Sequence, residues 1–72
     1  IELKKSSHVR LYILDLNGKE IRVITDQFFS QGINSFNWDS KDSRGRNVPA
    51  GIYFYKMKAN DIIKSRKMVL IK

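Results

Sequence analysis

The sequence predicts an all-β fold, a small antiparallel β-sandwich of six to seven strands in a single domain, residues 1–72. Short runs of β-branched and aromatic residues alternate with polar residues, and no run has the 3.6-residue period of a helix. Turn-forming clusters of Asn, Asp, Ser and Gly separate these runs. Trp38 and the pair Tyr53 and Tyr55 supply the bulky side chains that a small two-sheet core needs.

The first three predicted strands lie in the first third of the chain. Residues 1–4 predict a short first strand, because apolar and charged residues alternate there. The second strand covers residues 9–14, and its apolar face is formed by Val9, Leu11 and Ile13. Asn17-Gly18 then predicts a hairpin turn with positive φ at both residues. A third strand, residues 21–24, returns antiparallel to the second.

Residues 25–32 are expected to connect the third strand to the fourth, with Phe28 and Phe29 closing one end of the sandwich. Seven strands are usual in this architecture and six are apparent. Either the first strand is truncated or residues 25–32 hold an irregular edge strand. The fourth strand is expected around Phe36 and Trp38, which alternate with polar neighbours.

The last two predicted strands form a hairpin around Asn60-Asp61. In the fifth strand, residues 52–58, the face expected to meet the core carries Tyr53, Tyr55, Met57 and Ala59. The sixth strand, residues 63–71, ends in Met68-Val69-Leu70-Ile71, which is apolar on both faces. Such a segment is typical of a strand covered on both sides or of one that another protein recognises. The strands and turns together predict an immunoglobulin/fibronectin-like β-sandwich.

Composition excludes several kinds of site. The chain has no cysteine and a single histidine, His8, so it cannot form a disulfide, a thiolate metal site or a histidine-based triad. We expect His8 to lie on the surface. The turn with Asp39, Asp42 and Ser43 offers oxygen atoms, but it lacks the register of a calcium loop and contains three basic residues. We therefore expect backbone-capping roles there, and neither a metal, a cofactor nor enzyme activity.

The chain has a net charge of +7, from 14 basic and 7 acidic side chains. Residues 56–72 contain six of the basic residues and one acidic residue. A basic edge can bind an acidic partner or an anionic lipid head group, and it can equally deter edge-to-edge pairing of sheets. No nucleic-acid-binding pattern is present, so we expect no nucleic-acid partner. No apolar run approaches the roughly 20 residues that span a membrane, so no transmembrane segment is expected.

Three motifs in order carry a resemblance to a known family. They are the hairpin Val9–Ile21, the turn Trp38–Arg46 and the segment Pro49–Tyr55, which a lysine-rich strand with an apolar end follows. Together they resemble the C-terminal sorting domains of the type IX secretion system of Bacteroidetes and related bacteria. The chain departs from that pattern at Leu14, where Tyr is common, and at Ser40, where Gly is common. The hairpin and the turn also resemble the immunoglobulin-like module of flagellar hook-capping proteins.

The sorting resemblance implies a non-catalytic secretion signal at the C-terminus of an unknown cargo protein. The chain starts with Ile1 and has no signal peptide, which is in keeping with a piece of a larger protein. The implied partners are the outer-membrane translocon, a shuttle protein and a cell-surface sortase. The implied location is the periplasm in transit, then the cell surface or the medium. The candidate partner-binding residues are Lys64, Arg66, Lys67, Met68, Val69, Leu70, Ile71 and Lys72.

Five residues are expected to determine the fold: Trp38, Pro49, Gly51, Tyr53 and Tyr55. Pro49 fixes its φ, and Gly51 is expected to permit a close approach of the backbone. Tyr53 resembles a tyrosine corner, whose hydroxyl bonds to the backbone upstream. Two other functions stay open for the domain. One is a passive accessory or spacer domain of a secreted hydrolase or adhesin, and the other is an assembly module like that of hook-capping proteins.

Overall fold

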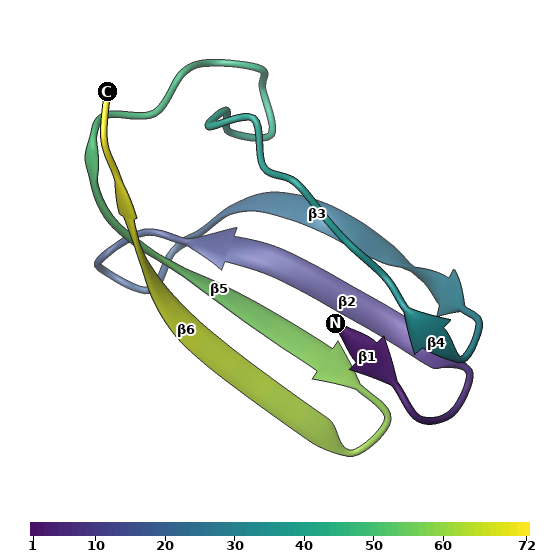
Figure 1. The fold of residues 1–72 in the computed structure, drawn as a ribbon. Helices are drawn as coiled ribbons and strands as arrows, with labels where there is room; N and C mark the ends of the chain where they lie inside the picture. The colour runs from purple at the N-terminus through teal and green to yellow at the C-terminus, as the bar shows by residue number, and fades with distance from the viewer.

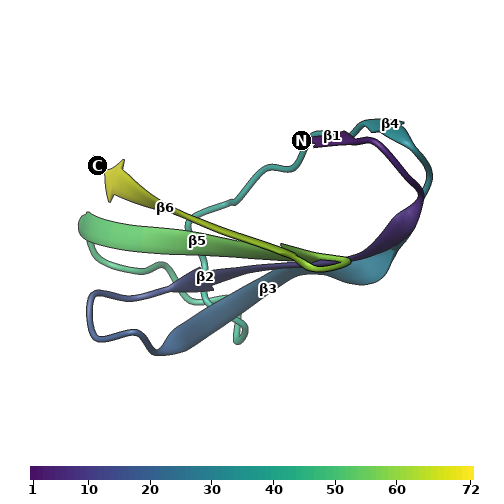
Figure 2. The same ribbon diagram turned by 90° about the horizontal axis from the view of Figure 1, so that it is seen from below.

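The computed structural model describes residues 1–72 as six strands and no helix. The strands are β1 (Glu2–Leu3), β2 (Ser7–Leu14), β3 (Glu20–Phe29), β4 (Gly32–Ile33), β5 (Gly51–Ala59) and β6 (Ile62–Leu70). They form a four-stranded sheet in the order β3-β2-β5-β6 and a two-stranded ribbon, β1-β4 (Figure 1). All pairs are antiparallel. Figure 2 shows the ribbon on one side of the larger sheet. The predicted antiparallel β-sandwich is confirmed.

Strand β2 lies between β3 and β5, and one of its faces forms the core. Val9, Leu11 and Ile13 are at most 8% exposed, as the alternation of the sequence predicts. Leu11 lies opposite Met57 and Ile13 lies opposite Tyr55 on β5. The predicted core face of the fifth strand is therefore confirmed by its pairing with β2.

Strand β3 is longer than expected, because residues 25–29 continue the strand that starts at Glu20. It is an edge strand, and its register against β2 shifts twice, with Ile21 and Ile24 as the extra residues. Both isoleucines pack against the core. The interpretation of this segment as an irregular edge strand is confirmed, and its role as a mere connection is wrong. Both bulges lie within the part of the strand that the sequence predicts, whereas residues 25–29 pair with β2 without a shift. Asp26, Gln27 and Phe28 are exposed, so this part of the edge strand lacks the alternation of a half-buried strand.

The strand expected around Phe36 and Trp38 does not form, although both side chains reach the core. The Phe36 ring meets Phe29 edge-on with centroids 5.3 Å apart, and the Trp38 ring meets Tyr53 at 5.4 Å. An extended segment with one face on the core has the same two-residue period as a strand, even where no ladder forms. Phe28 is 66% exposed, so of the two phenylalanines expected to close the sandwich end only Phe29 packs inward.

The β2–β3 turn differs from the expected two-residue turn. Asp15 Oδ1 accepts hydrogen bonds from the backbone N–H groups of Asn17 and Lys19, both at 2.9 Å. Gly18 has a φ of +82°, whereas Asn17 does not have a positive φ. The expectation of positive φ at both residues is therefore wrong. The Asp15 carboxylate stabilises a longer loop with one left-handed residue instead.

The entry to β5 is held by the predicted tyrosine corner. Tyr53 Oη donates a hydrogen bond to the carbonyl oxygen of Pro49 at 2.6 Å. Gly51 has a φ of +152°, and a Cβ atom there would meet nothing within 4 Å. The expected close approach is thus wrong, and Gly51 is required by its backbone angle.

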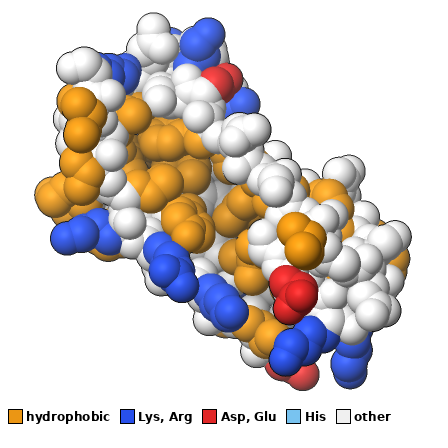
Figure 3. All heavy atoms as spheres, viewed as in Figure 1, with side chains coloured by type: hydrophobic (Ala, Val, Ile, Leu, Met, Phe, Trp, Pro, Cys, Tyr) orange, Lys and Arg blue, Asp and Glu red, His pale blue; other side chains and the backbone are white.

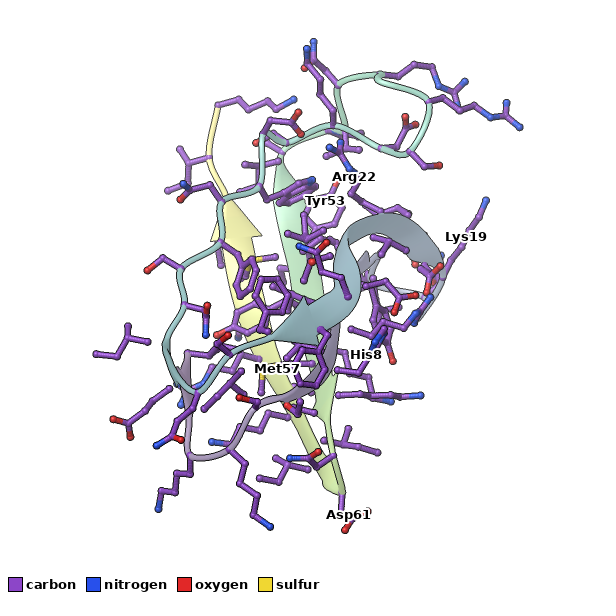
Figure 4. The ribbon with its side chains drawn as sticks, turned by 90° about the vertical axis from the view of Figure 1, so that its right-hand side faces the viewer. His8, Lys19, Arg22, Tyr53, Met57 and Asp61 are labelled. Atoms are coloured by element: carbon purple, nitrogen blue, oxygen red, sulfur yellow. The ribbon has the colours of Figure 1, made fainter.

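The polar turn after Trp38 is built by carboxylates that cap backbone amides, as the sequence predicts. Asp42 Oδ1 accepts from the N–H groups of Arg46 and Arg44, at 3.0 and 2.9 Å. Asp39 Oδ1 accepts from Arg22 Nη1 at 3.1 Å, and Figure 4 shows Arg22 beside this turn. The hydrogen bond from Arg46 N–H, with that from Arg44, holds the pKa of Asp42 below its ordinary value.

Ser40 in the same turn has a φ of +63°, a region that costs a non-glycine residue about 1–2 kcal/mol. Glycine avoids that strain but loses about 0.5–1 kcal/mol in backbone entropy. We therefore expect Ser40→Gly to raise the free energy of unfolding by about 0.5–1 kcal/mol in urea denaturation. Ser43→Gly is the control, since Ser43 has no positive φ, and it should not stabilise the protein. A destabilised Ser40→Gly would contradict the assignment.

The lowered pKa of Asp42 predicts a pH-dependent contribution to stability. Because the folded pKa lies below the unfolded one, the contribution is present at neutral pH and is lost as the pH falls through the folded pKa. Asp42→Asn keeps an acceptor atom but removes the charge. It should lower the urea midpoint at about pH 7, and the difference from the parent should shrink at about pH 2.5. Asp61→Asn at the tip of the β5–β6 hairpin is the control (Figure 4). An Asp42→Asn effect that did not change with pH would refute the assignment.

Candidate functional site

The basic strand β6 forms one edge of the larger sheet. It pairs with β5 over nine consecutive residues without a register shift, and no strand pairs with its other side. All side chains from Ile62 to Lys67 are exposed. The candidate partner-binding residues thus lie on a free strand edge, where backbone and side chains are both accessible.

The register of β6 divides its cations between the two faces of the sheet. Lys64 lies opposite Met57 and Arg66 lies opposite Tyr55, so both cations share the face that carries the core. Lys67 points to the opposite, outer face, because successive side chains of a strand alternate. The candidate partner-binding residues therefore lie on two separate surfaces, one on each face of the sheet.

The apolar end of β6 is covered on one side only. Met68 and Leu70 are half-buried and pack against the core cluster that contains Tyr53. Val69 and Ile71 are 62% and 84% exposed. Lys72 Nζ donates a hydrogen bond to the backbone of the loop before β5. The sequence allowed two interpretations of the apolar run Met68–Ile71. Coverage on both sides is wrong for the isolated chain, and recognition by another protein remains a prediction.

The cations of β2 and β3 are paired, whereas those of β6 are not. Arg10 bonds to Glu20 at 2.5 Å and lies over the ring of Tyr12 at 4.3 Å, and the hydrogen bond to Glu20 raises the pKa of Arg10. His8 is exposed as expected, and its ring Nε2 meets the Asp26 carboxylate. None of the ion pairs involves a residue of β5 or β6. Within the larger sheet, the cations that form no ion pair therefore lie on β5 and β6.

The outer face of the sheet carries an apolar strip that the sequence analysis missed. Leu14 lies opposite Phe54 on β5, and Ile52 lies opposite Val69 on β6. Ile52 is 39% exposed and Val69 is 62% exposed. These residues sit on strand faces that look mixed in sequence, and only the register between strands brings them side by side. The sequence does contain one signal for this strip, because each of these apolar residues lies on the face of its strand that does not meet the core.

On the core side a groove lies open beside β6. Its volume is about 280 Å³, and nine of its ten lining residues are hydrophobic. Tyr55 and Met57 contribute from β5, Met68 from β6, and Trp38 and Ile1 from the covering layer. Figure 3 shows hydrophobic side chains gathered in this hollow, with a row of Lys and Arg side chains along the margin formed by β6.

Neither surface gathers the side chains of a metal site. The structure brings together no group of three or more His, Asp and Glu side chains that could hold a metal ion. It also contains no helix with the length and hydropathy needed to cross a lipid bilayer. What the arrangement offers is a free strand edge, unpaired cations and exposed apolar surface, which are features of protein-binding sites.

Comparison with known families supports one of the two resemblances found in the sequence. The model of the FlgD Ig-like domain matches residues 1–61, that is, the chain up to the β5–β6 turn. No curated protein and no solved structure matches the chain. Nothing in these comparisons supports a type IX sorting domain. Because the match covers most of the chain, the protein belongs to the FlgD Ig-like domain family.

Proposed function

We propose that the chain is a non-catalytic assembly module that docks onto a partner protein. The observation that carries this proposal is the match of residues 1–61 to the FlgD Ig-like domain family. The hairpin and the turn also resemble the immunoglobulin-like module of hook-capping proteins. The function therefore depends on the surface that the domain presents to its partner.

The physical properties of β6 support docking at this edge. A free strand can accept backbone hydrogen bonds from an added strand, and its side chains then select the partner. The unpaired cations Lys64, Arg66 and Lys67 would speed the encounter with an acidic surface. The apolar strip around Val69 and Ile52 would contribute burial on the outer face.

The absence of cysteine allows a direct test by site-specific cross-linking. Single Ile62→Cys and Lys67→Cys variants of the chain place one probe on each face of β6, since Ile62 lies opposite the core residue Ala59 and Lys67 points outward. Labelled with a benzophenone maleimide and irradiated in assembled material, at least one of them should give a discrete adduct. Gel mobility and mass spectrometry identify the partner. Ser43→Cys, in the turn far along the chain, is the matched control and should give none. Absence of an adduct from both β6 positions would favour the passive spacer, and an adduct from Ser43→Cys alone would place the docking surface elsewhere.

A second candidate function is the type IX secretion signal that the sequence resemblance implies. One observation favours it, namely that β6 is exposed, basic and apolar at its end, and lies outside the part of the chain that the family model matches. In this case the partners would be the translocon, the shuttle protein and the sortase, and the domain would pass from the periplasm to the cell surface.

Export separates the two candidates. The chain is fused behind a fluorescent protein that carries a signal peptide, and the fusion is expressed in a type IX host. We expect fluorescence to stay in the periplasm, because assembly and not export is the proposed function. An established sorting domain in the same fusion is the positive control. Surface fluorescence comparable to that control would overturn the assembly proposal in favour of sorting.

A further inference from the structure

The two layers of the sandwich differ in width. The larger sheet has four strands about 4.8 Å apart, whereas the ribbon facing it has two strands of two residues each. In Figures 1 and 2 the ribbon lies toward β2, and no strand lies over the middle of β6. Ten of 72 residues are buried, in keeping with a core that is covered in part.

The edge of β1 that faces this uncovered side is available for pairing. Ile1 and Asn34 exchange backbone hydrogen bonds, at 2.5 and 2.7 Å, which ties one edge of β1 to the segment after β4. In an antiparallel pair the next residue turns its N–H and C=O groups the other way, so those of Glu2 point away from β4. A further strand beside β1 would lie over β5 and β6.

The groove beneath that position is long enough for a strand. The hollow lined by Trp38 and Met68 adjoins a second one of about 370 Å³ lined by Leu3 and Ile62, because Met57 lines both. Together the two hollows reach from Met68 to Ile62, which is six residue steps of β6 or roughly 20 Å at about 3.3 Å per residue. This length accommodates a strand of six or seven residues.

The rim of the groove is basic. Lys64 lines the second hollow together with Lys4 and Lys5, against the single carboxylate of Glu2. Arg66 lies on the same face of β6, between Lys64 and Met68. Packed sheets are about 10 Å apart, and lysine and arginine side chains span most of that distance. The charged ends of these side chains would therefore lie beside a strand bound in the groove, close to the side chains of that strand that face the solvent.

We propose that this groove binds an extended peptide segment of the partner in which acidic and apolar side chains alternate. This inference rests on the proposed assembly function and names the chemistry of its partner. The apolar side chains would fill the hollow over Met57, and the acidic ones would pair with Lys64 and Arg66. A second copy of this chain is disfavoured as the occupant, because it would bring a further +7 charge against a basic rim.

The chain contains its own reporters for the groove. Trp38 is the only tryptophan, and Met57 and Met68 are the only methionines, and all three line it. A blocked nine-residue peptide in which glutamate alternates with valine is the probe. On titration it should change the Trp38 emission in a saturable way and shift both methionine methyl resonances in NMR spectra of methyl-labelled protein. The apparent affinity should fall as salt is added.

Charge reversal on the two faces of β6 provides matched variants. Lys64→Glu and Arg66→Glu should each weaken peptide binding by about fivefold or more, because they reverse charges at the rim. Lys67→Glu makes the same charge change on the same strand but on the outer face, and it should alter binding less than about twofold. All three positions are exposed, so thermal melts should show that the variants stay folded.

Three results would overturn the inference. They are unchanged methionine resonances, equal binding of a peptide with lysine in place of glutamate, and a loss from Lys67→Glu as large as that from Lys64→Glu. The last two would show unspecific attraction and not a groove. Failure of peptide binding alongside a discrete β6 cross-link would reject the groove and leave the assembly function standing. Peptide binding without any cross-link in assembled material would keep the groove and reject assembly.

Discussion

The pairing of β2 with two neighbours at once is the constraint on which the other elements depend. Because β2 lies between β3 and β5, its backbone is satisfied on both sides, and Val9 is fully buried beneath the ribbon. The register with β5 then places Met57 and Tyr55 beside the β2 core residues. Through β5 the same register determines which side chains of β6 face the core and which face outward. The two surfaces of the candidate site are therefore a consequence of the second strand.

Much of the fold could be predicted because it depends on short-range rules. The alternation in β2 and β5 reflects burial on one face, and the carboxylate of Asp42 caps amides two and four residues along the chain. The corner formed by Tyr53 is likewise local, since its partner is Pro49. Each of these features is encoded within a few residues, so a sequence pattern can identify it.

The features that the sequence did not predict depend on contacts between distant segments. The bulges at Ile21 and Ile24 break the alternation of β3. The segment with Phe36 has the sequence pattern of a strand because Phe36 packs on Phe29, although the segment forms no ladder of backbone hydrogen bonds. To predict the groove, one must know how little of the larger sheet the β1-β4 ribbon covers. To predict the apolar strip on the outer face, one must know the register of three strands. A pattern in one segment carries no information about either. The alternation of the last strand divides its candidate residues between two faces, but which of the two faces meets the core follows only from the pairing with β5.

The two edges of the larger sheet also differ in their tendency to self-associate. Strand β3 is interrupted by two bulges, which make a poor template for another strand. Strand β6 is regular over nine residues, and the mutual repulsion of its lysine and arginine side chains is its main protection against stacking on other copies. Such repulsion is weakened by salt within a Debye length of about 10 Å at 0.1 M. The solubility of the domain is thus coupled to ionic strength through the same cations that suit β6 for docking.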